Sequence, residues 1–192
     1  MKINRLLMTA IFSFVGVLAV AQSWMMQPQG PVNEFSAMEG TSVLNYNFQV
    51  ERNIHSRAGN GPVFYIFPDC KLDNNQALEL AGNLDLVNII KEYGGRIMVV
   101  NPSSDKWQEQ DLEDFRRLIG MGGSPTNVKV IGIGSGATFV NRQLVATELA
   151  GVIAGIVSID GEPGKICRLP VPAFIGGKNA AKAAKPYQAT SD

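Results

Sequence analysis

Residues 128–139 read VKVIGIGSGATF, and this stretch determines how the rest of the chain is interpreted. A short run rich in β-branched residues leads into Gly132, Gly134 and Gly136, with Ser135 between the last two. A segment of helical character follows. A strand, a glycine-rich turn and a helix in this order can hold a catalytic nucleophile or bind a phosphate. The turn therefore favours a nucleophile, a phosphate site, or a protein that keeps only the shape of one of these.

Apolar segments of strand length alternate with segments of helical periodicity along the chain. Apolar runs without alternation are typical of strands buried on both faces of a parallel sheet. Apolar residues at three- and four-residue spacing predict helices near 74–90, 112–119 and 137–150. The sequence thus predicts an α/β fold, a mostly parallel sheet with helices on both faces, and it places the strands at 62–67, 96–100, 128–133, 152–159 and 171–177.

The composition is that of an ordinary globular protein. The chain has 192 residues, 45% of them hydrophobic and 18% charged, which suits one domain with a single core. Seventeen basic residues balance seventeen acidic ones, so no net field favours nucleic acid as a partner. One histidine and two distant cysteines offer no spacing typical of metal ligands, and the sequence predicts no metal site and no cofactor.

The first 21 residues have the features of a signal peptide. Lys2 and Arg5 precede an apolar run over 6–20, and Ala19 and Ala21 form a cleavage pattern before Gln22. The run of about fifteen residues is short for a transmembrane helix of roughly twenty. We therefore expect a periplasmic or secreted protein with no transmembrane segment in the mature chain. Residues 22–40 are interpreted as a flexible leader, and 41–192 as a single domain.

The two cysteines, Cys70 and Cys167, would be exposed to an oxidising compartment after export. Sequence alone does not place their Cα atoms within bonding distance. Two unpaired thiols are therefore favoured over a disulfide, which stays open at this point.

The chain resembles the first half of the α/β-hydrolase fold, and it is most similar to secreted esterases and polyester depolymerases. The resemblance covers residues 60–179. It is carried by the pattern of four segments, each followed by a helix or loop: VFYIFPD (63–69), RIMVVNP (96–102), VKVIGIGSGA (128–137) and GIVSIDG (155–161). The resemblance implies a partial three-layer sandwich in which the turn after 128–133 is the nucleophile elbow, G-x-S-x-G.

The elbow pattern requires small residues two positions before and two after the nucleophile. With Ser135 as nucleophile, the first of these positions is Ile133, whose branched side chain does not suit so tight a turn. With Gly132 and Gly136 as the flanking residues, the central position is Gly134, which has no reacting side chain. The sequence therefore favours an elbow without a nucleophile, and Ser135 stays the candidate if the enzyme is active.

The partners of a catalytic serine are also missing from their usual places. In the family, the acid and then the histidine follow the nucleophile along the chain. The only histidine, His55, precedes the buried strands and is interpreted as a surface turn residue. Asp160 and Glu162 are alternative acids, but loop or cap roles suit them better. An unusual base, Lys165 or Lys178, would leave Ser135 active, but neither lysine has a spacing that recommends it.

The anion-binding part of a hydrolase site could remain in a protein that has lost its catalytic residues. The family's oxyanion hole would be built from the backbone amides of Ser135 and of Asp69 or Cys70. The N-terminus of a helix also binds anions. We therefore expect a small ester or anionic ligand near 134–137.

Two other interpretations stay open. One is a non-catalytic binding or envelope-associated module on the hydrolase-like scaffold, which needs no triad and accepts Gly134. The other is a dinucleotide site. Gly132, Gly134 and Ala137 match the dinucleotide fingerprint G-x-G-x-x-G/A, with Asp160 as the ribose-binding acid. Against it, two strand–helix units precede the fingerprint, and export separates the protein from free nucleotides. The favoured interpretation is an exported α/β-hydrolase-like protein, related to carboxylic-ester hydrolases, that is incomplete or catalytically silent as written.

Overall fold

The computed structural model describes residues 33–36, 42–47, 62–93, 95–121, 127–165, 167 and 171–188. The expected signal peptide and the histidine at position 55 lie outside these residues. Within them, no helix has the length and apolar character needed to cross a membrane.

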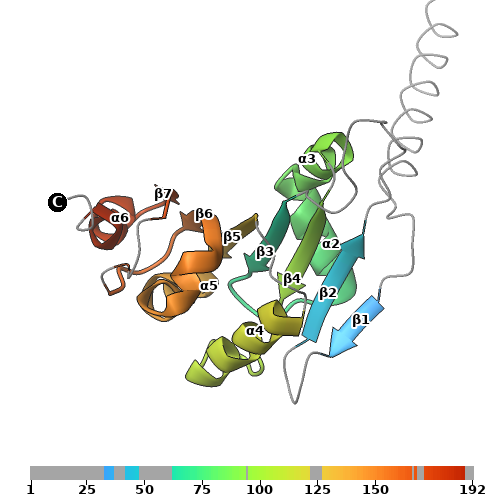
Figure 1. Cartoon of the computed structure of the whole chain (residues 1–192), viewed down its shortest axis with the longest axis horizontal. Helices are drawn as coiled ribbons and strands as arrows, with labels where there is room; N and C mark the ends of the chain where they lie inside the picture. The colour runs from blue at the N-terminus through green and yellow to red at the C-terminus, as the bar shows by residue number, and fades with distance from the viewer. Residues whose placement is uncertain are drawn as a thin grey trace, which may run out of the picture.

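A single sheet organises the described part of the chain (Figure 1). Its strand order is β1-β2-β4-β3-β5-β6-β7, with β4, β3, β5, β6 and β7 parallel and the β1–β2 pair antiparallel at the β4 edge. This confirms the predicted α/β class with a mostly parallel sheet. The strands are β1 Asn33–Ser36, β2 Ser42–Asn47, β3 Val63–Phe67, β4 Arg96–Val100, β5 Val128–Ile133, β6 Ile153–Ile159 and β7 Ala173–Gly176.

Helices cover both faces of the sheet and divide the core into two layers (Figure 1). Strand β3 shows the division, because Tyr65 packs toward one layer and Ile66 toward the other, as expected from the two-residue period of a strand. Helices α4 (Glu109–Met121) and α5 (Ser135–Arg142) lie on the Tyr65 side. Helices α2 (Asn74–Asn83) and α3 (Leu86–Tyr93) lie on the other, and α6 (Ala180–Gln188) lies beside β7.

Aromatic side chains join the carboxyl end of β3 to both helices of the first layer. The Phe67 ring, fully buried, lies 4.9 Å from Phe115 of α4 and 5.8 Å from Phe139 of α5, between ring centroids. Trp107, in the segment between β4 and α4, lies 5.3 Å from Phe67 and stacks on Phe139 at 4.8 Å. Such ring contacts each add about 0.5–1.5 kcal/mol beyond burial. The cluster therefore fixes the 105–109 segment against α5.

The expected helix over 74–90 is two helices, and the expectation of one was wrong. The chain turns at Leu84 and Asp85, and Asp85 has the left-handed φ of 55°. Its carboxylate accepts a hydrogen bond from Asn88 Nδ2 at 2.6 Å, which supports the turn. The apolar spacing continues across this break, so periodicity alone does not reveal it.

Two other boundaries differ from the sequence expectation. The helix expected over 137–150 ends at Arg142, and two short 3-10 turns, Leu144–Ala146 and Glu148–Val152, replace its second half. Strand β1 falls within 22–40, where a leader without regular structure was expected, because its backbone pairs with β2. Cys70 is exposed and Cys167 is buried, and the two form no disulfide.

A buried polar contact ties α6 to α5. The Tyr187 hydroxyl donates to Asn141 Oδ1 at 2.7 Å, and the Asn141 side chain, fully buried, donates through Nδ2 to the Glu162 carbonyl at 2.9 Å. Burial raises the pKa of the Tyr187 hydroxyl, and nearby Cys167 raises it further. Both effects favour the neutral phenol in the folded protein.

This contact predicts a loss of stability in base. A tyrosine whose pKa is raised on folding contributes fully below the unfolded pKa of about 10, and its contribution falls as the pH rises above that value. Tyr187→Phe should cost about 1–2 kcal/mol near neutral pH, because Asn141 Oδ1 loses its donor. The variant should also lose less stability than the wild type between about pH 9 and pH 11. Urea unfolding across this range measures both effects, and an equally steep decline in the two proteins would contradict the assignment.

Candidate functional site

The carboxyl ends of β3 and β5 form the point where the sheet topology changes direction. Strand β3 lies between β4 and β5, and the chain passes from β3 to β4 on one side before crossing to β5 on the other. In open α/β sheets, the crevice outside the strands at such a point is where ligands bind. Here it is bordered by the loop that begins at Pro68 and by the turn at Gly134.

Gly134 lies at the apex of the turn between β5 and α5. It has φ 56° and ψ −118°, a conformation that residues with side chains rarely adopt, and its N–H donates to the Ile159 carbonyl at 2.8 Å. A Cβ atom at Gly132 would lie 2.6 Å from the Ala137 Cα, and one at Gly136 would lie 2.1 Å from the Phe67 carbonyl oxygen. The two flanking positions thus require glycine, and the central position between them is Gly134.

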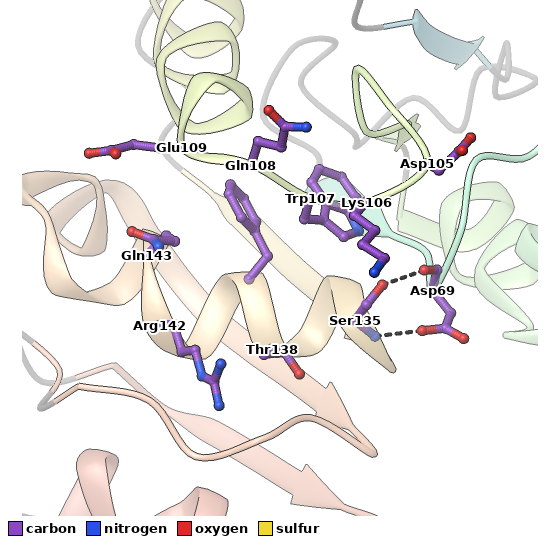
Figure 2. Close-up of a pocket in the computed structure, with 11 residues that line it drawn as sticks. Asp69, Asp105, Lys106, Trp107, Gln108, Glu109, Ser135, Thr138, Arg142 and Gln143 are labelled. Carbon is purple, nitrogen blue, oxygen red and sulfur yellow. Dashed lines mark hydrogen bonds between the residues drawn. The ribbon is translucent and has the colours of Figure 1, made fainter.

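The Asp69 side chain fills the space above this apex. A Cβ atom added to Gly134 would lie 2.2 Å from Asp69 Oδ1 and 2.5 Å from Asp69 Cγ. The same Oδ1 accepts a hydrogen bond from the Ser135 N–H at 2.6 Å, and the Ser135 hydroxyl donates to the Asp69 carbonyl (Figure 2). Both polar groups of Ser135 are therefore engaged with one residue of the opposite loop.

One of the three amides expected to form an oxyanion hole is bonded within the chain. The Ser135 N–H donates to the Asp69 carboxylate, and the oxyanion-hole role of this amide stays a prediction. The amides of Asp69 and Cys70, the other candidates, donate to no acceptor in the described residues. The N–H groups at the N-terminus of a helix favour a negative charge, and at α5 that charge is the carboxylate of Asp69.

The acids that follow β6 have roles in the turns of the sheet edge. Asp160, with φ 56°, accepts the Lys178 N–H at 2.9 Å and lies against Gly177. Glu162 accepts a hydrogen bond from Asn179 Nδ2 at 3.2 Å. Both carboxylates thus anchor the turn before α6, which agrees with the loop roles that suited them better.

The dinucleotide interpretation conflicts with the geometry at two points. Gly132 and Ala137 pack closely, as the first and last positions of the fingerprint would. The space at Gly134, however, where a pyrophosphate would approach the backbone, contains the Asp69 carboxylate, which would repel it. Asp160, the expected ribose-binding acid, is bonded to the Lys178 amide.

A cavity of about 480 Å³ lies beside Ser135, between α5 and the 105–109 segment (Figure 2). In Figure 2, Ser135 lies at one end and Gln143 at the other, with Trp107 between them, and Phe139 also contributes apolar surface to the lining. The lysines at 165 and 178, considered as unusual bases, do not line this cavity. Its lining residues are Asp69, Asp105, Lys106, Trp107, Gln108, Glu109, Ser135, Thr138, Phe139, Arg142 and Gln143.

Two side chains missed as site residues hold the loop after β3 in place. Trp107 Nε1 donates to the Pro68 carbonyl at 2.9 Å. Asn101, almost fully buried, accepts from the Leu72 N–H at 3.0 Å and donates to the Leu72 carbonyl at 2.8 Å. A signal for Asn101 existed in the sequence, because it is a polar residue directly after a buried strand. Nothing in the sequence indicated the partner of Trp107.

No metal centre is evident in the part of the chain that the structure describes, because no three His, Cys, Asp or Glu side chains are grouped there in a way that holds an ion.

Comparison with known proteins gives likeness in structure only. No family model and no curated protein matches the sequence. Among solved structures, the chain is similar to a carboxylesterase structure from Nitrososphaera gargenis, at 18% identity and a TM-score of 0.45, over 71% of this chain and 47% of that one. It is similar to a predicted CIB-like hydrolase from Thermoplasma acidophilum, at 15% identity and a TM-score of 0.42, over 79% and 62%.

A third similar structure is Est1E from Butyrivibrio proteoclasticus, at 12% identity and a TM-score of 0.46, covering 65% of this chain and 49% of that one. The chain thus spans about half to three-fifths of the length of these solved structures.

The contact between Asp69 and Ser135 predicts a local effect of substitution. Asp69→Ala removes the acceptor of the Ser135 N–H, so that amide should exchange faster with solvent, and the protein should lose about 1 kcal/mol of stability. Asp69→Asn keeps a side-chain oxygen at the same place and should retain most of the protection. Amide hydrogen exchange by NMR measures the effect, and an unchanged Ser135 rate in Asp69→Ala would contradict the hydrogen bond.

Proposed function

We propose that this protein is an exported, α/β-hydrolase-like binding protein that holds a small ligand in the cavity beside Ser135 without hydrolysing it. The observation that carries the proposal is the occupied apex. Gly134 has no reacting side chain, and the Asp69 carboxylate lies where one would project. A nucleophile at this position would need a side chain, which Gly134 lacks, and the Asp69 carboxylate would have to move to admit one.

The environment of Ser135 supports the same conclusion. Its hydroxyl donates to a backbone carbonyl, which leaves the proton held by an acceptor that does not act as a base. A serine nucleophile needs a base within hydrogen-bond reach and an acid that orients this base. The Asp69 carboxylate instead binds the Ser135 amide, and it would repel the negative charge that develops on a substrate carbonyl during ester hydrolysis.

The cavity supports binding as the remaining role. Its volume of about 480 Å³ lies within the roughly 300–1,000 Å³ typical of small-molecule sites, and it lies at the switch point of the sheet. Its aromatic side chains, Trp107 and Phe139, are held by the ring cluster around Phe67, so this part of the surface exists before a ligand arrives. Preformed sites lose less free energy to ordering on binding.

The absence of ester hydrolysis is tested with p-nitrophenyl acetate and a fluorophosphonate probe. We expect the wild type and Ser135→Ala to give the same background rate, and neither to be labelled. Ser135→Ala is the matched control, because it removes only the hydroxyl. Turnover or labelling that disappears in Ser135→Ala would show an active serine and overturn the proposal.

Export is tested separately. The proposal rests here on the basic start, the apolar run and the Ala19/Ala21 pattern, and it predicts a mature protein that begins at Gln22. N-terminal sequencing of protein recovered from the periplasm or medium measures this. Retention of Met1 on protein that stays inside the cell would contradict it.

A further inference from the structure

Strand β7 is an open edge of the sheet. It pairs with β6 on one side, and on its other side it pairs with no strand of the described residues. The carbonyls of Pro172 and Gly176 accept hydrogen bonds from β6 and the residue after it, at 2.9 and 3.0 Å. Because alternate residues of a strand turn their backbone groups to opposite edges, Ala173 and Ile175 direct their N–H and C=O groups outward. These groups can pair with an added strand.

The residues of this strand do not block such pairing. Proteins often protect an edge strand with a lysine, a proline or a bulge. Residues 173–176 read AFIG, and their register with β6 is regular. With four residues, however, β7 offers only a few backbone hydrogen bonds to a partner. The side chains around the edge therefore decide which segment binds.

An exposed aromatic side chain lies on one face of this edge. Phe174 is 66% exposed, more than the other large hydrophobic side chains described as exposed. It is in register with Val157 of β6, which packs against the layer of α2 and α3, so Phe174 lies on that face of the sheet. Neighbouring strands bring side chains of one face within about 5 Å of each other. An added strand with an apolar residue beside Phe174 would cover it.

The opposite face of the same edge is basic. Helix α6 lies beside β7 on this face, where Tyr187 packs against the layer that contains α5 (Figure 1). Residues 163–191 contain no aspartate or glutamate, although acidic and basic residues balance in the whole chain. Lys178, Lys182 and Lys185 are exposed and form no ion pair with a described residue. This local charge favours a partner with carboxylates on this face.

The nearest acids of the chain lie at one end of this surface. Asp160 accepts the Lys178 N–H at 2.9 Å, and Glu162 accepts from Asn179 Nδ2 at 3.2 Å. Both carboxylates are thus held at the turn between β7 and α6. Helix α6 itself carries no acidic residue, so its lysines are not neutralised along the helix.

Two other occupants satisfy fewer of these features. In an antiparallel pair of β7 strands from two copies, the α6 lysines of both copies would lie on the same face of the joined sheet and repel each other. An anionic membrane would attract those lysines. It would leave the outward backbone groups of β7 unpaired, and it would not reach Phe174 on the other face.

We propose that β7 is the docking strand for an extended segment of a partner protein in which apolar and acidic residues alternate. In a strand paired with Ala173 and Ile175, alternate side chains point to opposite faces. The apolar ones then meet Phe174, and the carboxylates lie on the face of α6. The contact is smaller than the roughly 1,200–2,000 Å² of stable interfaces, so binding is weak and reversible. This surface is separate from the cavity beside Ser135.

The test uses three capped heptapeptides and the protein that begins at Gln22. EVEIEVE has the alternation, EEVIVEE has the same composition without it, and KVKIKVK has the opposite charge. Binding is followed by NMR of the backbone amides. We expect EVEIEVE to shift the Ala173 and Ile175 signals in a saturable way and to slow the exchange of these amides with solvent. The other two peptides should bind several-fold more weakly, and added salt should weaken EVEIEVE.

Substitutions locate the site. Phe174→Ala should weaken EVEIEVE several-fold, and the exposure of Phe174 means that the fold is retained. The double variant Lys182→Glu/Lys185→Glu should bind KVKIKVK more tightly than EVEIEVE, because the charge of α6 is reversed. Lys71→Glu, which changes an exposed lysine in the loop after β3, is the matched control and should leave the order of the peptides unchanged. Unchanged EVEIEVE affinity in both the Phe174 and the α6 variants would overturn the proposal.

The remaining outcomes distinguish the occupants. If no peptide shifts the Ala173 and Ile175 signals, or if all three bind equally, the assignment of an acidic strand is wrong. If these amides exchange slowly without peptide and sedimentation shows a dimer, a second copy occupies the edge instead. If vesicles of phosphatidylglycerol shift the α6 signals while EVEIEVE does not bind, the lysines serve a membrane surface and the docking strand is wrong.

Discussion

The close approach of α5 to the end of β3 is the constraint on which the site depends. Gly136 lies so near the Phe67 carbonyl that a Cβ atom there would be 2.1 Å from the oxygen. This approach is what brings the first amide of α5 over the loop after β3. The Asp69 carboxylate then meets the Ser135 N–H at 2.6 Å. The contact that closes the turn is thus a consequence of backbone packing between a strand end and a helix.

Similar side-chain contacts join the other neighbouring loops at the carboxyl edge of the sheet. Asn101, after β4, holds Leu72 in the loop after β3 through two hydrogen bonds. Asp160, after β6, holds the Lys178 amide in the turn after β7. Each contact uses a short polar side chain at the end of one strand to satisfy backbone groups of the next loop. Together they join the loops that border the crevice, and the cavity along α5 is its open part.

The sequence predicted the fold class because its signals are local. Apolar runs are enough to indicate a parallel sheet, and the glycine turn is enough to indicate that a strand is followed directly by a helix at β5 and α5. The break at Asp85 was not predictable, because the apolar spacing continues through it and only the left-handed φ ends the helix. The pairing of Asp69 with Ser135 spans 66 positions and depends on which strands are neighbours. Contacts of this kind depend on topology, which local patterns do not specify.

The occupied apex also limits the order in which substitutions are tolerated. A serine introduced at Gly134 would place its Cβ 2.2 Å from Asp69 Oδ1, in a backbone conformation that already strains any residue with a side chain. A change at Asp69 to a smaller residue first would remove this collision. We therefore expect the two positions to be coupled: a serine at Gly134 should cost less stability once Asp69 is replaced by a smaller residue.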